Sequence, residues 1–388
     1  MKGRRDPPRR VNCGTKGRPD RDRTIARAVC AWFSGHARPM PWRITPRDPY
    51  LSLVSEVMLQ QTQVSRVLEK WPGFVGRFPT LAALAAEPEQ AVLAAWSGMG
   101  YYRRARHVHA AAREIVSRFG GRVPDDPVAL RSLPGIGRYT AGAIASIVYG
   151  RTEPIVDGNV ARVLLRVEGK RLGPEEGVKW AWERAETLVQ SSSAGALQSG
   201  GLSRSSRLSR GGRREGVGPA MLNEGLMELG AVVCTPRSPR CGECPLTRVC
   251  VARARGVQDR IPRAKRAVLK RPIYCATVLI EDSRGRVLVE RRGTAGLWAG
   301  MWQAPTIERP RRAPTRREIE RTLGVGPIER VERFTRALSH RDATFDVWHA
   351  SEATPKTPTP PGGRWVTRAA LKTLALGVPQ RRILLGTE

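Results

Sequence analysis

The sequence predicts a mostly α-helical protein that ends in a smaller α+β domain. Apolar residues recur at helical spacing through most of Thr24 to Gly150, in segments separated by proline and glycine. From Ile273 onward the pattern changes to alternating β-branched residues around a turn, as in YCATVLIEDSRGRVLVERR. Four cysteines crowded at 234–250, between these two regions, indicate a metal site.

The charge of the chain indicates a polyanionic partner. Its 388 residues suffice for two or three domains, and 67 Lys and Arg against 35 Asp and Glu give a formal net charge of +32. This excess excludes a protein whose partners are only neutral small molecules, because the repulsion among the cations would go uncompensated. We therefore expect a nucleic acid as the partner.

The N-terminal part of the chain should combine one helical domain with two segments unable to fold alone. Residues 1–23 are rich in Arg, Pro and Gly and are expected to form a disordered basic tail. Residues 24–255 should form an all-α domain, including helices at 159–167 and 178–189. Residues 191–217 interrupt this domain with a Ser/Gly/Arg insertion that is too polar to bury a core, and is expected to be flexible.

The C-terminal part should be a separate domain. A basic linker is expected at 256–272, followed by an α+β domain at 273–388. Strands are expected near 328–334 and 344–349, and short helices near Thr315 and Thr367.

The sequence contains no run of about eighteen apolar residues and no apolar leader segment, so neither a membrane span nor a secretory signal is expected. Seven cysteines, four of them clustered, favour a metal site in a reducing compartment over a disulfide framework. We expect a cytoplasmic protein that is associated with the nucleoid.

The clustered cysteines have the spacing C-x6-C-x2-C-x5-C, formed by Cys234, Cys241, Cys244 and Cys250. Zinc sites usually pair two close C-x2-C-type knuckles, and here there is only one. The spacing therefore favours a [4Fe–4S] cluster, with zinc as the alternative.

A glycine-rich turn, LPGIG at 133–137, ends one helix and begins another. Gly135 and Gly137 can both adopt positive φ and let the backbone approach a ligand. The unpaired N–H groups of the following helix face the same point, so the turn can hold a phosphate without sequence preference. The alternative is an ordinary turn between two helices.

Two acids are candidates for catalysis. Glu56 lies among apolar residues in LSLVSEVMLQQT, so desolvation should raise its pKa and retain the proton that a general acid needs. Asp157 precedes a helix in IVDGNVARVLLRV, where backbone N–H donors should keep a capping carboxylate ionised. One protonated and one ionised acid form the pair that cleaves a glycosidic bond. The alternatives are a solvated helical Glu and a simple N-cap.

Together these motifs resemble the endonuclease III-like superfamily of DNA glycosylases. The resemblance is carried by LPGIGRYTAG, VDGN, SEVMLQQTQV, GMGYYRRAR and the four-cysteine spacing. Within this superfamily the chain is similar to the adenine DNA glycosylases of the MutY type, strongly over 24–255 and more weakly over 273–388. The resemblance implies a helix-hairpin-helix core with a [4Fe–4S] cluster loop, followed by a Nudix-like domain.

The resemblance also implies a reaction. The enzyme would remove adenine mispaired with 8-oxoguanine or guanine in double-stranded DNA, acting as a monomer. Glu56 would protonate the flipped adenine and Asp157 would stabilise the sugar cation, with Asn159 and Tyr139 completing the site. Bifunctional relatives have a Lys where Tyr139 stands, and its amine forms a Schiff base. Tyrosine cannot do this, so a monofunctional enzyme is expected.

Contacts to DNA are implied at several further positions. Gln61 and Tyr102 would fill and wedge the opened base stack. The alternatives are an exposed polar residue at 61 and a core aromatic residue at 102. The Nudix-like domain would contact 8-oxoguanine through Ser339 and His340, which follow Leu338 where the family usually has Phe. The segment REIERTLGV at 317–325 lacks the paired acids of a Nudix hydrolase, so pyrophosphatase activity is not expected.

Two other functions remain open on the sequence. One is a helix-hairpin-helix glycosylase for another mismatched or oxidised base. The other is a non-catalytic iron–sulfur protein that binds DNA.

Overall fold

The structure is a computed structural model that describes residues 19–198, 218–264, 269–350 and 362–386. The chain divides into two compact units, each assembled from separate stretches of sequence. The first unit comprises 1–52, 125–128 and 137–265, and the second comprises 53–124, 129–136 and 266–388. The helical region expected at 24–255 therefore contributes to both units.

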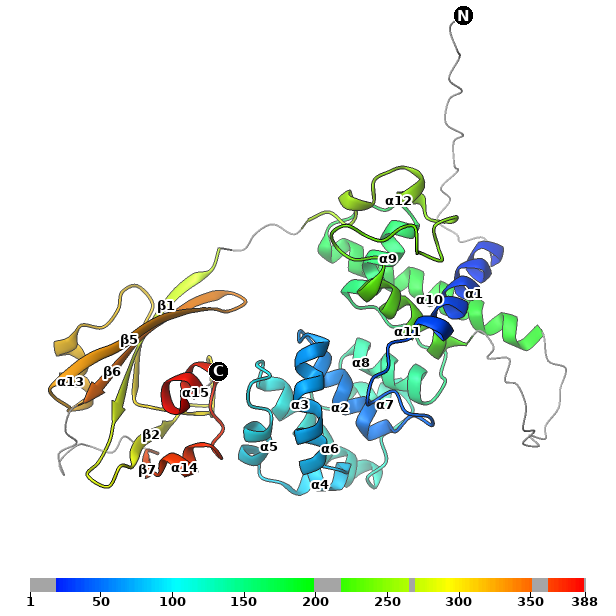
Figure 1. The fold of residues 1–388 in the computed structure, drawn as a ribbon. Helices are drawn as coiled ribbons and strands as arrows, with labels where there is room; N and C mark the ends of the chain where they lie inside the picture. The colour runs from blue at the N-terminus through cyan, green and yellow to red at the C-terminus, as the bar shows by residue number, and fades with distance from the viewer. Residues whose placement is uncertain (1–18, 199–217, 265–268, 351–361, 387–388) are drawn as a thin grey trace, which may run out of the picture. The chain divides into compact units, whose positions relative to one another are not determined.

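The first unit is helical, and α9 lies at its centre. Every residue of α9 from Val160 to Val167 is buried, and the helix packs against α10, α11 and α12. Helix α1 packs against α10 and α11 (Figure 1). The described elements are α1 (Pro19–His36), α8 (Arg138–Ala143), the π-helix η1 (Ile144–Val148), α9 (Gly158–Val167), α10 (Pro174–Gln198), α11 (Pro219–Val232), α12 (Val251–Ala254) and the 3-10 helix η2 (Gln258–Arg260).

Helix α1 begins at Pro19, ahead of the expected start at Thr24. Its Asp22 is fully buried and accepts two hydrogen bonds from Arg184 of α10. A buried carboxylate requires such a partner, and this pair anchors the first turns of α1. The prediction of a disordered tail over 1–23 is therefore wrong for 19–23, and 1–18 lie outside the described residues.

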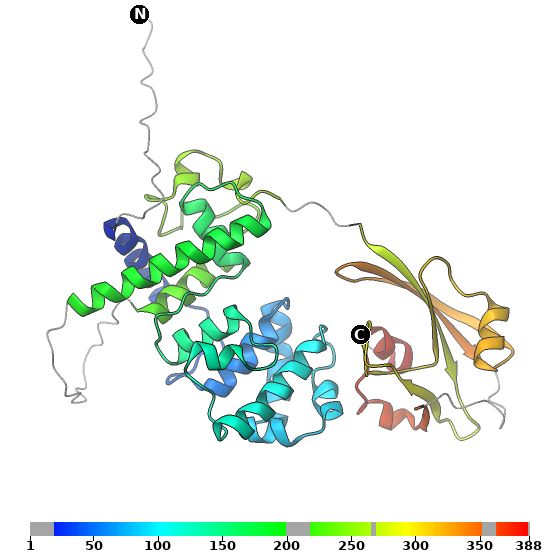
Figure 2. The same ribbon diagram turned by 180° about the vertical axis from the view of Figure 1, so that it is seen from behind.

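Helix α10 continues to Gln198, beyond the expected end at Val189 and into the segment predicted as an insertion (Figure 2). Residues 191–198 contain Ser, Ala and Leu but no proline, so a helix already formed can extend through them at one hydrogen bond per residue. The expectation of a flexible insertion is therefore wrong for 191–198, which continue α10. The rest of that segment, 199–217, lies outside the described residues.

The helices of the second unit surround an aromatic core. Phe74 contacts Phe78 and Trp96 edge to face, with ring centroids 5.0 and 5.5 Å apart. Helix α6 buries one face against this core and ends at Gly120, whose φ of 57° is left-handed. The helices are α2 (Pro49–Leu59), α3 (Val64–Arg77), α4 (Leu81–Ala86), α5 (Glu89–Ala95), α6 (Arg103–Phe119) and α7 (Pro127–Arg131), with α2 and α7 crossing the division between units.

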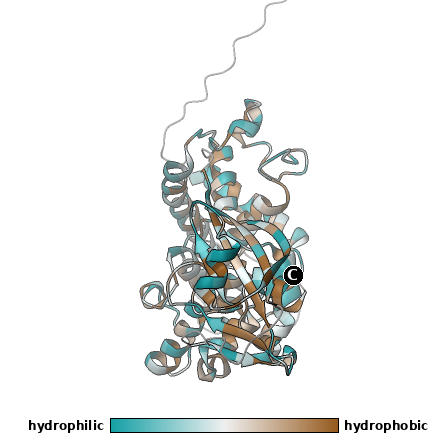
Figure 3. Cartoon of the chain, turned by 90° about the vertical axis from the view of Figure 1, so that its left-hand side faces the viewer, coloured by the Kyte–Doolittle hydropathy of each residue, from teal (hydrophilic) through white to brown (hydrophobic). Residues whose placement is uncertain are grey.

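The C-terminal part of the second unit is built on two sheets, with strand orders β4-β1-β6-β5 and β3-β2-β7. The two long central strands β1 and β6 are parallel, and β5 and β6 form an antiparallel hairpin. In β1 the residues from Cys275 to Val278 are all buried, whereas exposed and half-buried residues alternate along β5 from Glu332 to Ala337. Hydrophobic and hydrophilic residues both occur along the strands (Figure 3). The strands are β1 (Arg271–Ile280), β2 (Val287–Arg291), β3 (Trp302–Gln303), β4 (Thr306–Arg309), β5 (Ile328–Ala337), β6 (Arg341–Ala350) and β7 (Arg364–Val366).

Three helices accompany these strands: α13 (Arg316–Leu323), α14 (Arg368–Leu371) and α15 (Val378–Leu385). The hydroxyl of Thr315 caps α13 and that of Thr367 caps α14, each accepting a backbone N–H. The short helices expected near these two threonines are confirmed, as are the strands expected near 328–334 and 344–349. The mostly α fold with a smaller α+β domain is also confirmed. Among the described residues, no helix has the length and apolar character needed to span a bilayer.

Candidate active site and cysteine centre

Asp157 is the N-cap of α9. Its Oδ1 accepts a hydrogen bond from Val160 N at 2.7 Å, and its Oδ2 accepts one from Nδ2 of Asn159 at 2.9 Å. Burial nevertheless raises the pKa of Asp157, because desolvation outweighs these donors. The direction is opposite to the one expected from the donors alone. Burial therefore disfavours the ionised form of Asp157 more than its hydrogen bonds favour it.

A chain of hydrogen bonds joins Asp157 to the cysteine region. Oδ1 of Asn159 accepts a hydrogen bond from Nη2 of Arg162 at 2.8 Å. The Nε of the same arginine donates to the carbonyl oxygen of Cys234 at 2.8 Å. One side chain therefore sets the orientation of Asn159, and through it Asp157, relative to the loop that follows α11.

Close packing of α11 against α9 depends on Gly230. A Cβ on Gly230 would lie 2.6 Å from Cβ of Asn159. The carbonyl of Gly230 accepts a hydrogen bond of 2.9 Å from Arg162. Sequence reasoning did not identify Gly230 or Arg162 as functional. The available signal was the presence of two arginines, Arg162 and Arg166, in an otherwise apolar helix.

The four cysteines predicted as ligands line one pocket, together with Arg166. Nη1 of Arg166 lies 3.3 Å from Sγ of Cys234 and also donates to the carbonyl of Thr235 at 2.7 Å. Among the described residues no group of three or more His, Cys, Asp or Glu is placed to hold a single metal ion. Four thiols that line one pocket can supply the four thiolate ligands of an iron–sulfur cluster. The donor set therefore fits an iron–sulfur cluster.

The glycine-rich turn packs against α6. Gly135 has φ of 73°, and a Cβ there would lie 2.4 Å from the ring of His107. Gly137 has φ of −87° and ψ of −179°, which is extended backbone. Gly135 therefore uses the positive φ that a glycine can adopt, whereas Gly137 serves as the N-cap of α8. Tyr139 lies in the first turn of α8 and is half-buried.

Glu56 lies on α2 and is 8% exposed, as the apolar sequence around it indicated. It belongs to the second unit, whereas Asp157, Asn159 and Tyr139 belong to the first. Within the first unit the structure brings Asp157 and Asn159 into direct contact.

Gln61, Tyr101 and Tyr102 differ in how far their side chains are exposed. Gln61 is exposed and has φ of 55°. Tyr102 is only 6% exposed, whereas Tyr101 is 47% exposed with φ of 46°. A ring that is buried in the protein core cannot enter a base stack, so the prediction for Tyr102 is wrong on burial, and Tyr101 presents the accessible ring. The signal in GMGYYRRAR was the turn at Gly100, which displays the first tyrosine, whereas the second is the N-cap of α6.

Ser339 and His340 are the two central residues of the turn between β5 and β6. The turn is closed by a hydrogen bond of 2.8 Å from Leu338 N to the carbonyl of Arg341. Both residues are exposed, and Leu338 packs partly against the core cluster around Phe345. The turn therefore displays the serine and histidine but retains the leucine.

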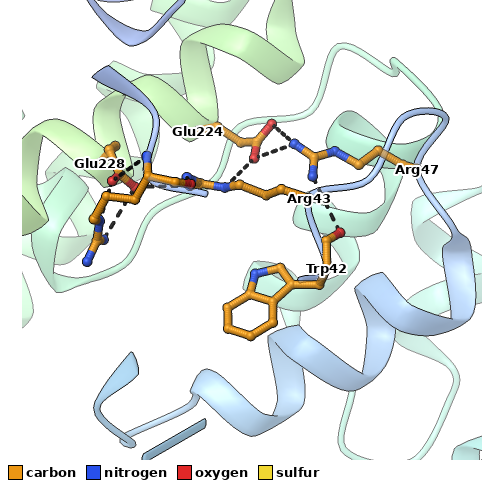
Figure 4. Close-up of polar contacts among 6 residues, drawn as sticks. Trp42, Arg43, Arg47, Glu224 and Glu228 are labelled. Carbon is orange, nitrogen blue, oxygen red and sulfur yellow. Dashed lines mark hydrogen bonds and ion pairs between the residues drawn. The ribbon is translucent and has the colours of Figure 1, made fainter. Parts of the chain in front are cut away.

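An ionic cluster in the first unit was not anticipated from the sequence (Figure 4). Arg38 and Arg43 bind Glu228 of α11, and Arg47 binds Glu224 one turn earlier with both contacts at 2.8 Å. Burial alone would raise the pKa of Glu228, but the hydrogen bonds from the two arginines lower it overall.

The ionic cluster fixes the loop that precedes α2 on α11. Arg47 also donates to the carbonyl of Trp42 at 3.4 Å, and the indole of Trp42 is turned away from the ionic groups (Figure 4). The loop arginines therefore position this tryptophan within the first unit.

Comparison with known proteins now identifies the family. Residues 54–179 match the HhH-GPD superfamily base excision DNA repair protein, 234–250 the iron–sulfur binding domain of endonuclease III, and 276–386 the NUDIX domain. The adenine DNA glycosylase of Homo sapiens is 31% identical over 92% of this chain and 72% of its own length. The chain belongs to the adenine DNA glycosylase family.

Other relatives match parts of the chain. The adenine DNA glycosylase of Mycobacterium tuberculosis (strain H37Rv) is 41% identical over 56% of this chain and 64% of its own length. A solved thermostable thymine-DNA glycosylase is 25% identical with a TM-score of 0.49, covering 61% of this chain and 98% of its own.

Membership confirms several predictions made from the sequence. The chain is a helix-hairpin-helix enzyme of base excision repair and therefore acts on DNA. Its cysteine loop is an iron–sulfur binding domain of the endonuclease III type, for a [4Fe–4S] cluster, and its C-terminal part is a Nudix domain.

Proposed function

We propose that this enzyme hydrolyses the N-glycosidic bond of adenine mispaired with 8-oxoguanine or guanine in duplex DNA, and leaves the strand uncut. The observation that carries the proposal is the arrangement at the start of α9. There the carboxylate of Asp157 accepts hydrogen bonds from Val160 N and Asn159 Nδ2. A carboxylate held in this way can stabilise positive charge on a bound sugar. Membership of the adenine DNA glycosylase family supports the same reaction.

The two acids have complementary roles. Glu56, buried on α2, delivers a proton to the extruded adenine and weakens the bond between base and sugar. Asp157 opposes the positive charge that develops on the sugar, and Asn159 holds its carboxylate in position. Water then completes the hydrolysis and leaves an abasic site.

Tyr139 limits the reaction to base release. A strand-cleaving glycosylase attacks the sugar with an amine and forms a Schiff base. The phenol of Tyr139, in the first turn of α8, cannot form that intermediate. The enzyme therefore has little lyase activity.

Several exposed positions meet the DNA. The turn containing Gly135 and Gly137 holds a backbone phosphate, as a helix-hairpin-helix turn does through its main-chain N–H groups. Gln61 and Tyr101 enter the opened base stack, because both are exposed on adjoining loops. Ser339 and His340, displayed on the β5–β6 turn, contact the base opposite adenine.

The cluster has a structural role at the cysteine loop. Cys234, Cys241, Cys244 and Cys250 hold it, and when bound it supplies four metal–thiolate bonds that fix the loop. Arg162 and Arg166 tie the same loop to α9. These hydrogen bonds attach the loop to α9, whose N-cap is Asp157.

The proposal is tested on a panel of duplexes that carry 8-oxoguanine·A, G·A, G·T or thymine glycol. Wild type should release adenine from the first two and leave G·T and thymine glycol intact. Glu56→Gln should reduce release by about 10²- to 10⁴-fold. Strand cutting should appear only after alkaline treatment, which reveals the abasic sites. Processing of the pyrimidine substrates with intact adenine mispairs would mean that the enzyme acts on another base.

A non-catalytic protein makes a different prediction in the same experiment. It would bind all duplexes without releasing any base, and Glu56→Gln would change nothing. Spontaneous strand cutting by wild type would instead overturn the monofunctional assignment while leaving the adenine specificity intact.

A further inference from the structure

Arg104, the second residue of α6, is a buried cation without an acidic partner among its hydrogen bonds. It is 7% exposed and makes six hydrogen bonds, five to main-chain carbonyls and one to a hydroxyl. The acceptors are the carbonyls of Val57, Met58, Gln60, Met99 and Gly100 and the hydroxyl of Thr62. Burial lowers its pKa to about 10, so the side chain remains a cation at neutral pH.

These acceptors lie on two separate segments. One segment is the end of α2 and the loop that contains Gln61, where Nη1 reaches Met58 O at 2.6 Å and Nη2 reaches Thr62 Oγ1 at 2.8 Å. The other is the loop before α6, where Nη2 reaches the carbonyl of Gly100 at 3.3 Å. One guanidinium therefore joins the Gln61 loop to the Tyr101 loop.

Each loop displays one exposed residue in the left-handed backbone region, Gln61 with φ of 55° and Tyr101 with φ of 46°. Side chains other than glycine rarely adopt this conformation, and it persists only where the surroundings fix it. Carbonyl acceptors next to both residues, at Gln60 and Gly100, bond to Arg104. The same side chain thus fixes the backbone immediately before each of the two displayed residues.

Arg104 also orients the exposed ring. Its guanidinium carbon lies 5.4 Å from the centroid of the Tyr101 ring and 5.4 Å from that of Trp96. Trp96 in turn donates from Nε1 to the carbonyl of Gly100 at 3.1 Å. A lysine cannot reproduce this arrangement, because an ammonium lacks the planar fork that reaches two loops and stacks between rings.

We propose that Arg104 is a positioning residue that locks the Gln61 and Tyr101 loops into one preformed unit, so that both side chains enter the DNA together and extrude the target base. This inference rests on the proposed function and extends it to the step before bond cleavage. It predicts that loss of Arg104 impairs extrusion of a paired base, and that the chemistry on a base already outside the stack is largely retained.

The test uses Arg104→Lys in the full chain, with Arg113→Lys as the matched control. Arg113 is an exposed residue of the same helix, and both substitutions keep the charge. Extrusion is followed by the fluorescence of 2-aminopurine placed opposite guanine. Base release is followed in single turnovers on a G·A duplex and on a duplex with a bulged, unpaired adenine.

Arg104→Lys should reduce extrusion and release from the G·A duplex by about 10- to 100-fold, since small misplacements of positioning groups have effects of this size. Release from the bulged adenine should fall less than about 3-fold by the same reasoning. Arg113→Lys should behave as wild type. The inference is overturned if Arg104→Lys matches Arg113→Lys, or if it loses equal activity on both substrates, which indicates general structural damage.

Thr62→Val provides a second test if Arg104→Lys does not fold. It retains the shape of the side chain but removes one acceptor of Arg104, and extrusion should fall by about 3- to 10-fold. Unchanged extrusion in this variant would contradict the inference. Wild type that extrudes 2-aminopurine but releases no adenine would refute the proposed function and leave the role of Arg104 standing.

Discussion

Two regions of the protein are each organised by a buried arginine that donates mainly to neutral acceptors. Arg162 in the first unit joins Asn159, and through it Asp157, to the carbonyl of Cys234. Arg104 in the second unit joins the loops of Gln61 and Tyr101. The first region surrounds the proposed catalytic acid Asp157 at the start of α9, which is buried from Val160 to Val167, whereas the second supports residues exposed on loops.

The difference shows how each region depends on its arginine. Helix α9 is held by packing on several sides, so Arg162 adjusts the orientation of groups already in place. Arg104 supplies six hydrogen bonds to the end of α2 and to the loops that carry Gln61 and Tyr101, so it determines where the exposed residues are held. Chemistry and DNA opening should therefore be separable by mutation.

The largest effect is expected for Asp157→Asn. Asparagine caps a helix as well as aspartate does, so α9 should remain intact. Base release should fall by about 10³-fold or more, because the charge opposing the sugar cation is lost. Extrusion of 2-aminopurine should be unchanged, with Asp125→Asn, an exposed acid, as the control. Loss of extrusion would show that the two regions do not act separately.

Tyr101→Ala should have the next largest effect, and it tests the second region. Removal of a stacking ring costs about 1–3 kcal/mol per base, so release from a G·A duplex should fall by about 10-fold or more. Tyr102→Phe keeps the buried ring and should change the rate by less than about 2-fold. A larger loss in Tyr102→Phe than in Tyr101→Ala would restore Tyr102 as the wedge.

Arg162→Gln should have a moderate effect on the chemical step. Asn159 and the carbonyl of Cys234 would each lose a donor, and loss of a residue that orients such ligands typically costs about 10-fold or more. Single-turnover release should slow on both the G·A and the bulged substrate, unlike Arg104→Lys. Iron content and the visible absorbance at roughly 400 nm, typical of such clusters, report whether the cluster is retained. If Arg162→Gln slowed release only from the G·A duplex and not from the bulged adenine, Arg162 would act on DNA opening, which contradicts the contrast drawn between the two regions.

The smallest effect is a shift in pH dependence. Burial raises the pKa of Asp157 above its ordinary value of 3.8, so the fall in base release on acidification should be centred above pH 3.8. The stability that Asp157 contributes is complete below 3.8 and is lost as pH rises through the raised folded-state pKa.

Asn159→Ala tests that shift. The substitution removes a donor that lowers the pKa of Asp157, so the acidic limb of the single-turnover rate should move to higher pH. If the acidic limb of the pH–rate profile did not move, a group other than Asp157 would control the rate at low pH. Asp157→Asn should abolish the limb and serves as the control.

Much of the architecture was legible in the sequence, because it depends on local pattern. Helical spacing before Gly150 and alternation after Ile273 predicted the fold class, and the spacing of the four cysteines predicted the cluster. Thr315 and Thr367 marked helix starts because an N-cap acts on its own next turns. Burial of Glu56 followed from the apolar residues beside it.

Only the tertiary structure decided the properties that depend on distant neighbours. The sequence did not distinguish Tyr101 from Tyr102, because their exposure is set by the turn and by the packing of α6. The raised pKa of Asp157 results from burial of α9 by other helices, and this desolvation exceeds the local effect of the cap. Arg104 joins segments that are far apart in the chain, as its bonds to the carbonyls of Gln60 and Gly100 illustrate. Such contacts depend on how helices pack, whereas the sequence pattern reports only neighbours along the chain.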